Sequence, residues 1–396
     1  MRGVTENESL SAQIQELPAT EWRALEDANF PFFDFAFLHA LEVTGCVGRK
    51  AGWTPHYLTI RNLGRLVGAS VVYTKSNSYG EYIFDWSWAE AYLAHGVPYF
   101  PKLTAAAPFT PATGPKFLCA SDVDKAIVAP QLIDAALALM ERGGHSSLHY
   151  LFVPESELSY FINAGFLIRH SYQYHWLNNT YQDFAAFIGS MKPKRRKQIQ
   201  RERDHLRSAG LTIKIVTGGD LTADYAKLFH SFYLSTIVKM RAIPYLSVEF
   251  FLNIFSTMRA EVVLMLAEES GSPIAGALYF RKGQCLYGRY WGALKEVRNL
   301  HFELCYYQPI EWAIGQGLQR FEAGAQGEHK IARGLLPQLT YSAHWIRHPG
   351  FREAIGQFIK DEQTAVKHYF DEIADHSPFV GKVGLRPHID DTGDAK

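Results

Sequence analysis

The chain has 396 residues, 47% of them hydrophobic and 20% charged, and its length predicts two domains of ~100–200 residues, each with its own core. Its 40 basic and 40 acidic side chains balance, which excludes a general DNA-binding surface because that needs an excess of Lys and Arg. The four cysteines form no C-x-x-C pair, and no run of ~18 apolar residues or apolar leader is present. We therefore expect a cytoplasmic protein with reduced thiols and no membrane insertion.

The first segments alternate helix and strand patterns. Two short helices are expected around an aromatic turn at Pro31, followed by a hairpin that turns at residues 62–64. Residues 80–88 alternate in a period of two, which predicts a third strand with Trp86 and Trp88 on one face.

The rest of the first half contains an irregular stretch and then regular elements. Five prolines between residues 98 and 115 exclude regular structure from much of that stretch. An amphipathic helix is expected over 122–144, and a buried strand over 147–154. A short helix over 155–166 and a strand over 167–179 follow.

The second half repeats this order after a basic helix. We expect a first unit over 1–180, a basic connecting helix over 181–210 and a second unit over 211–396. The second unit ends in a helix, strand, loop, short helix and strand over 300–346, which is rich in ionisable side chains, and in an amphipathic terminal helix.

Long stretches of the sequence resemble one bacterial family. They are EYIFDWSWAEAY, YFPKL, PFTPATGPKFL, GRYWGALKEVRNLHFELCYYQPIEWAIGQGLQRFEAGAQGEHKIARG and TYSAHWI. From about residue 17 to 379 the chain is similar to a family of predicted N-acyltransferases, often labelled peptidoglycan biosynthesis or recognition proteins, in the Fem-like branch of the GNAT superfamily.

The resemblance implies a fold and an activity. The fold is α/β (α+β), with tandem GNAT domains in the Fem-type arrangement. The activity is transfer of an acyl or aminoacyl group from an activated donor to a small-molecule amine by direct attack. The implied co-substrate is acyl-CoA or aminoacyl-tRNA, so tRNA is a possible partner, and no bound cofactor is expected. The alternative is a non-catalytic protein of the same fold that recognises a cell-wall precursor or an amino-acid conjugate.

The place where GNAT enzymes carry a glycine-rich pyrophosphate loop lacks glycine here. The matching residues are 298–303, and side chains at these positions crowd the approach to the backbone. Glu303 in the first helical turn would also repel a phosphate. Ordinary CoA binding is thereby disfavoured, although the choice of donor stays open. Asn299 is expected to cap this helix, and Pro309 to kink it.

Acylation of an amine needs a proton acceptor and donors for the oxyanion. The catalytic candidates are Glu322, His329, His301 and Glu303, although Glu303 has the alternative role of stabilising the helix N-terminus. Cys305 one turn from His301 is a possible nucleophile, but buried packing is its more ordinary role. His344 and His348 lie too far apart on a strand to share an ion, so no metal site is expected.

Substrate binding is expected from cationic and aromatic side chains in both halves. Lys330 and Arg333 are expected to hold a phosphate or carboxylate. Arg195 and Arg196 are expected to meet either tRNA phosphates or the diphosphate of a nucleotide-linked acceptor. The remaining binding candidates are Arg289, Tyr290, Trp291, Glu328, Tyr341, His344, Asp85, Trp86, Trp88 and Lys102.

Overall fold

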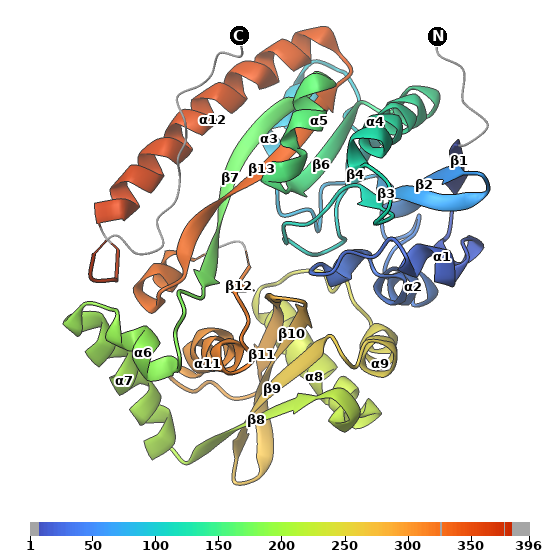
Figure 1. Cartoon of the computed structure of the whole chain (residues 1–396). Helices are drawn as coiled ribbons and strands as arrows, with labels where there is room; N and C mark the ends of the chain where they lie inside the picture. The colour runs from blue at the N-terminus through green and yellow to red at the C-terminus, as the bar shows by residue number, and fades with distance from the viewer. Residues whose placement is uncertain (1–7, 325–326, 376, 382–396) are drawn as a thin grey trace.

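The computed structural model describes residues 8–324, 327–375 and 377–381, and a 13-stranded sheet runs through them (Figure 1). The strands of the first half are β1 (Glu8–Ser11), β2 (Trp53–Asn62), β3 (Arg65–Lys75), β4 (Lys102–Ala105), β5 (Leu118–Cys119), β6 (Ser147–Val153) and β7 (Leu167–Leu177). Those of the second half are β8 (Leu211–Thr217), β9 (Val262–Glu269), β10 (Ser272–Lys282), β11 (Cys285–Ala293), β12 (Arg320–Glu322) and β13 (Leu336–Ile346).

The two halves share this sheet through the last strand of the chain. The strand order is β1-β2-β3-β4-β6-β13-β7-β12-β11-β10-β9-β8, with β5 paired to β3. β13 therefore lies between β6 and β7 and is antiparallel to both. The division into 1–180, 181–210 and 211–396 stays a prediction, but the last strand of the second predicted unit is built into the sheet of the first.

The sheet opens at β12, which is three residues long. β12 pairs in parallel with Cys285–Tyr287 of β11 and antiparallel with His175–Leu177 of β7. Beyond the end of β12, β11 continues to Ala293 and β7 reaches back to Leu167. In the described part of the chain, neither strand has a partner on these edges. We call the gap between 167–174 and 288–293 the sheet opening.

Helices cover both faces of the sheet (Figure 1). They are α1 (Ala19–Arg23), α2 (Phe35–Val43), α3 (Trp86–Ala94), α4 (Lys125–Arg142), α5 (Leu158–Asn163), α6 (Phe184–Gly189), α7 (Pro193–Ser208), α8 (Ala223–Lys239), α9 (Val248–Thr257), α10 (Leu300–Phe302), α11 (Gln308–Gly315) and α12 (Pro349–Asp375). α4 packs on the first-half strands, α8 and α9 on one face of the second-half strands, and α6, α7 and α11 on the other. None of the described helices is both long and apolar enough to span a membrane.

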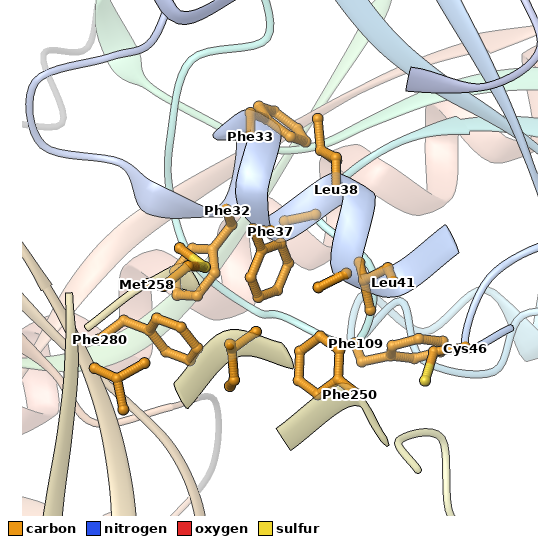
Figure 2. Packing of buried hydrophobic residues seen from close by; sticks show 14 of the residues in the cluster. Phe32, Phe33, Phe37, Leu38, Leu41, Cys46, Phe109, Phe250, Met258 and Phe280 are labelled. Atoms are coloured by element: carbon orange, nitrogen blue, oxygen red, sulfur yellow. The ribbon is translucent and has the colours of Figure 1, made fainter. Parts of the chain in front are cut away.

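An aromatic cluster joins the N-terminal helices to the sheet of the second half. Phe32 is fully buried, and its ring lies 5.3 Å from the ring of Phe280 and 5.2 Å from that of Tyr287. Figure 2 shows Phe37 beside it, above Phe250 of α9. Each such ring removes 150–250 Å² of surface from water, so this shared core fixes the first half against the second.

Local sequence patterns predict many of these elements correctly. The hairpin between β2 and β3 turns at Leu63 and Gly64, which have φ angles of 50° and 82°. The long helix of the first half is α4, capped by the Asp124 side chain, which accepts from the N–H of Ala126. The basic helix is present as α7, whereas the start of its predicted range forms the separate short helix α6, which has no Lys or Arg. The terminal helix is present as α12.

The predicted strand over residues 80–88 is wrong. The chain is irregular there until α3 begins at Trp86, so Trp86 is 40% exposed whereas Trp88 is 3% exposed on the opposite side. The cause is distant in sequence: Lys102 Nζ lies 2.8 Å from Glu81 and also pairs with Asp85, which bends this segment toward β4. Lys102 itself lies on a short strand within the stretch expected to be irregular.

The entry into the helix at residue 300 also differs from expectation. Asn299 adopts a left-handed conformation with φ of 68°, and its side chain makes no capping hydrogen bond. The helix is interrupted by a π-helical turn over Glu303–Tyr307, before Pro309, which lies in the first turn of α11. The irregularity expected at Pro309 is therefore present as the π-helical turn that directly precedes α11. The first strand expected within 300–346 spans only Arg320–Glu322.

Candidate functional site

A cavity of about 500 Å³, which we call the main cavity, lies in the sheet opening against β11. Its walls come from β10, β11, the helical turns from His301 to Tyr306, the residues after β12 and the segment 78–86 of the first half. Seven of the residues predicted for the site line it: Trp86, Arg289, Tyr290, Trp291, His301, His329 and Lys330.

The wall from the first half is held by buried ion pairs. Lys102 is fully buried, and its Nζ donates to Ser78 Oγ at 3.0 Å and to Glu81 Oε2 at 2.8 Å. It also donates to Asp85, whose pKa stays below its usual value because Lys102 and a buried histidine outweigh the effect of burial. Since Lys102 and Asp85 do not line the main cavity, we assign them to positioning its wall.

Two histidine side chains lie near each other on the side of the main cavity opposite the segment 78–86. The Nε2 atom of His329 lies 2.9 Å from the hydroxyl of Tyr306, and the ring centroids of His329 and His301 are 6.2 Å apart. Burial, together with His329 and Lys330, lowers the pKa of His301 to about 4. Burial and the cations Arg333 and Lys330 likewise lower the pKa of His329. Both rings are therefore neutral at physiological pH, although the lowered pKa makes each a weaker base than a free imidazole.

Lys330 brings a buried amine to the same cavity. It is 3% exposed, and its Nζ donates to the carbonyl of Gly324 at 3.0 Å. Burial lowers the pKa of Lys330 to about 8, so the amine is a cation that loses its proton easily. Cys305 also lines the cavity, but burial raises the pKa of its thiol strongly, so the thiolate needed of a nucleophile is disfavoured.

Arg289 projects from β11 into the main cavity. Its guanidinium donates to the carbonyl of Phe109 and lies 5.0 Å from the ring of Tyr290. The Nε atom is buried and has no hydrogen-bond partner in the described part of the chain. Arg289 thus keeps a donor free for a bound group.

Glu322 lies beneath the main cavity and does not line it. Its neighbours Phe321 and Ala323 do, whereas its own side chain is 2% exposed. Its carboxylate lies 3.1 Å from Arg320 Nε and 3.8 Å from His175 Nε2, and neither oxygen has a side-chain hydrogen bond in the described part of the chain. Burial outweighs Arg320 and raises the pKa of Glu322 to about 7. Contact with a substrate would need a water or a neighbouring residue.

Other predicted residues are engaged elsewhere. Glu303 is buried and pairs with Arg203 of α7 at 2.9 Å, which ties two helices together. Arg333 donates to Glu202 at 2.9 Å and stacks 3.4 Å from the ring centroid of Phe302, so it does not form a clamp with Lys330.

The remaining binding candidates lie away from the main cavity. His344 is buried, with its Nδ1 2.7 Å from the Nδ1 of His149, and its ring lies 5.0 Å from that of Trp88. Tyr341 packs against the ring of His170. Glu328 borders a separate cavity considered below. No group of three or more metal-ligating side chains gathers anywhere in the described residues.

Some residues of the site are missing from the sequence-based prediction. Tyr79 and Tyr82 form the first-half wall, Tyr245 closes one side, and Tyr306 holds His329. Their aromatic character alone does not separate them from core tyrosines, because 21 tyrosines occur in the chain. The signal that identifies them is the convergence of distant segments, which a single sequence does not contain.

A second concave surface, which we call the basic groove, lies along α7. It has a volume of about 560 Å³ and is lined by Lys194, Gln198, Arg201, Glu202, His205, Arg298 and Asn299. Lys194, Arg201 and Arg298 are exposed and form no ion pair among the described residues. Arg195 and Arg196 lie on the same helix outside the groove. The basic groove and the main cavity share no lining residue, but Asn299 of the groove and His301 of the main cavity are two residues apart in the chain.

The raised pKa of Glu322 predicts a pH-dependent stability. A carboxyl group with a folded pKa near 7 and an unfolded pKa near 4.5 favours folding below pH 4.5, and this contribution is lost as the pH rises to 7. In Glu322→Gln, the free energy of unfolding should therefore fall less between pH 4.5 and 7 than in the wild type, by up to about 3 kcal/mol. Urea titrations between pH 4.5 and 7 measure this free energy of unfolding, and the variant Glu328→Gln, at an exposed position, is the control. Identical pH profiles for Glu322→Gln and the wild type would contradict the assignment.

The chain is similar to a known protein family and to several solved structures. The model of the FemAB-like family, described as peptidoglycan biosynthesis/recognition, matches residues 13–381. The solved structure of FemX resembles the chain with a TM-score of 0.51 and 11% identity, over 86% of this chain and 98% of FemX. The C-terminal domain of a putative lysylphosphatidylglycerol synthetase from Agrobacterium fabrum gives 0.53 and 11%, over 86% and 94%.

A conserved protein of unknown function from Bacteroides thetaiotaomicron gives a TM-score of 0.50 and 7% identity, over 84% of this chain and 98% of that protein. At these identities the likenesses establish the fold alone, and they confirm the expected Fem-type, GNAT-like architecture. A search of curated proteins finds no match. Because the family model spans nearly the whole chain, the protein belongs to the FemAB-like family of peptidoglycan biosynthesis/recognition proteins.

Proposed function

We propose that the protein is an N-acyltransferase that moves an acyl or aminoacyl group from an activated donor to an amine within the main cavity. The observation that carries this proposal is the convergence of two neutral imidazoles, His301 and His329, and the buried amine of Lys330 in the sheet opening. Membership of the FemAB-like family supports the same class of reaction.

Direct attack requires two proton movements. An acceptor that enters as an ammonium ion first loses one proton, and its nitrogen then attacks the carbonyl carbon of the donor. After the C–N bond forms and the bond to the leaving group breaks, one proton goes to the leaving group and the other to solvent. His329, held by Tyr306, is the proposed first proton acceptor because its ring is neutral and borders the cavity.

The tetrahedral intermediate carries a negative charge on the former carbonyl oxygen. Lys330 and Arg289 are the cations that line the main cavity, and each has N–H groups able to donate to that oxygen. Because Lys330 is held by the carbonyl of Gly324, little reorganisation is needed as the charge develops. Cys305 has no covalent role in this scheme, since its raised pKa keeps it a thiol.

The donor is proposed to place its phosphates in the basic groove. Acyl-CoA and aminoacyl-tRNA both carry phosphates, and the unpaired Lys194, Arg201 and Arg298 offer them positive charge. The groove is made by side chains, in a place where no glycine-rich loop is present. Both donors are consistent with it, and the salt dependence of activity distinguishes them.

The proposal predicts that His329→Ala lowers turnover by roughly two orders of magnitude, because the first proton acceptor is removed. Product formation from a panel of acyl-CoAs and aminoacyl-tRNAs with amine acceptors is followed by mass spectrometry. His348→Ala, at an exposed position preceding α12, is the matched control and should retain activity. Full turnover in His329→Ala would remove this residue from the mechanism. Stabilisation by a cell-wall precursor without turnover on any donor would favour the non-catalytic recognition function.

The basic groove predicts a second result. Arg201→Gln and Arg298→Gln should each raise the KM for the donor, with kcat nearly unchanged, since they remove charge far from the reacting bond. For a tRNA donor, each substitution should also reduce the slope of log affinity against log salt by about one. Arg196→Gln, on the same helix but outside the groove, is the control. Equal effects of all three substitutions would show that the overall positive charge of this region, and not the groove, determines donor affinity.

A further inference from the structure

Two cations line the main cavity without a carboxylate partner. Lys330 is 3% exposed and Arg289 is half-buried, and their hydrogen-bond partners among the described residues are neutral groups. Three other buried cations, Lys102, Arg203 and Arg333, instead pair with a carboxylate at 2.8 or 2.9 Å. A cation held out of water without a counter-ion is unfavourable. The main cavity therefore lacks a negative charge that a ligand can supply.

No Asp or Glu among the described residues lines the main cavity. Glu322 lies beneath it, with its side chain 2% exposed and its carboxylate 3.1 Å from Arg320 Nε. Burial raises the pKa of Glu322 to about 7 against the effects of Arg320 and Arg289, so this carboxyl group is only partly ionised at neutral pH. It therefore does not supply a full counter-charge to Arg289 and Lys330.

Glu328 belongs to a second cavity, of about 310 Å³, along β7. Arg169 and residues 171–174 form one wall of this second cavity, and the segment 82–84 forms another. Two residues of that segment also line the main cavity, so the segment lies between the two cavities. Glu328 itself is exposed, and water screens its charge from the cations of the main cavity.

Two tyrosine hydroxyls lie beside the guanidinium of Arg289. The Nη2 atom of Arg289 lies 3.5 Å from the hydroxyl of Tyr290. Burial raises the pKa of Tyr82 to about 12, and the charge of Arg289 opposes this rise, so the hydroxyl of Tyr82 is also near the guanidinium. A guanidinium has five N–H donors, and among the described residues only Nη2 of Arg289 donates. We call Arg289, Tyr82 and Tyr290 the anion subsite.

We propose that the main cavity takes a substrate that carries a carboxylate, which the anion subsite binds in the same cavity as His329 and Lys330. A guanidinium holds a carboxylate through two parallel N–H···O bonds, which fix its position and orientation. Lys330 is then the donor left for the oxyanion. That the bound molecule takes part in transfer rests on the proposed function, whereas binding of the carboxylate does not.

The carboxylate has two possible sources with the same chemistry. The amine acceptor supplies it if the acceptor is an amino acid, and the donor supplies it if the acyl group comes from a dicarboxylic acid. In both cases the cations of the cavity favour the neutral, reactive form of the acceptor amine. The same cations disfavour an aminoacyl group, whose own ammonium would find no carboxylate among the described lining residues.

Pairs of ligands that differ in one carboxylate test the proposal by calorimetry on the full chain. N-acetyl-L-amino acids with uncharged side chains, each paired with its C-terminal amide, carry the carboxylate on the acceptor side. N-propylsuccinamic acid, paired with N-propylbutanamide, carries it on the acyl side. Acids of one kind should bind about tenfold or more tightly than their neutral counterparts, and that kind identifies the source.

Three results of this titration would each overturn the proposal. They are no binding by acids of either kind, neutral counterparts that bind as tightly as the acids, and tighter binding of inorganic phosphate than of every acid. The last result would assign the subsite to a phosphate of the donor.

Ligands with an added ammonium group test the exclusion of an aminoacyl group. Glycyl dipeptides replace the N-acetyl-L-amino acids, and the α-propylamide of L-aspartic acid replaces N-propylsuccinamic acid. Each should bind about tenfold or more weakly than the acid that it replaces, because its ammonium group faces unpaired cations. Equal or tighter binding would contradict the assignment of the main cavity to anionic substrates.

Variants of the anion subsite test the protein side. Arg289→Gln should abolish the preference for the acids, whereas Arg281→Gln, at an exposed position of β10 outside the main cavity, should keep it. If Arg289→Gln fails to fold, Tyr82→Phe decides, because it removes one hydroxyl and should weaken binding of the acid severalfold without affecting its neutral counterpart. An unchanged preference in the folded Arg289→Gln, or in Tyr82→Phe where that variant decides, would contradict the proposal.

The outcomes separate this inference from the proposed function. Transfer between a donor and an acceptor that both lack a carboxylate, with no selective binding of acids, would overturn the inference and leave the acyltransferase intact. Selective binding of acids that depends on Arg289, but no transfer from any donor, would do the reverse.

Discussion

The architecture of the site depends on one constraint, the shortness of β12. Three residues suffice to pair β11 with β7, and beyond them the sheet lacks a strand. Main-chain donors and acceptors at the free edges must find other partners, because buried peptide groups are costly when left unpaired. The opening is therefore both a space for a ligand and a source of hydrogen bonds. The main cavity lies on the β11 side, and the second cavity on the β7 side.

Buried charges hold the walls of this opening in place. Lys102 ties down the segment 78–86, and Arg203 ties α7 to the helix that carries His301. Such groups are buried only together with their partners, since a lone buried charge is strongly unfavourable. Glu322 has the least complete set of partners among them, which is why burial raises its pKa to about 7. Ion pairs thus hold the walls of the site in place, whereas the protonation state of Glu322 changes near neutral pH.

Local sequence patterns predicted individual helices, strands and turns, but not which distant residues contact one another. Turn residues at 63–64, the cap at Asp124 and the period of α4 each act over a few residues, so they could be predicted. The segment 80–88 has the alternation of a strand, yet Lys102 overrides that preference through contacts made only in the folded chain. Single-sequence patterns do not contain such pairings.

The residues of the candidate site also divide into those that the sequence identifies and those that only the folded structure identifies. His301, His329 and Lys330 were found because they are ionisable and close in sequence, and the structure places them on one cavity. Glu303 satisfies the same criterion but pairs with Arg203, from which it is separated by 100 residues. Tyr306, which contacts His329, lies in the π-helical turn, whereas the sequence predicted only a kink at Pro309 and not this turn. Family resemblance supplied the fold, whereas the roles of individual residues required the geometry.

The central claim is that acyl transfer takes place in the sheet opening. Ala323 follows β12 directly and lines the main cavity, so a larger side chain there fills the opening where β11 and β7 diverge. The most direct test is a single-turnover assay of Ala323→Phe, with the melting temperature and circular dichroism as measures of folding. We expect a folded protein whose transfer rate falls at least ~100-fold, because the reacting groups can no longer meet. A folded variant that transfers at the wild-type rate would contradict the account.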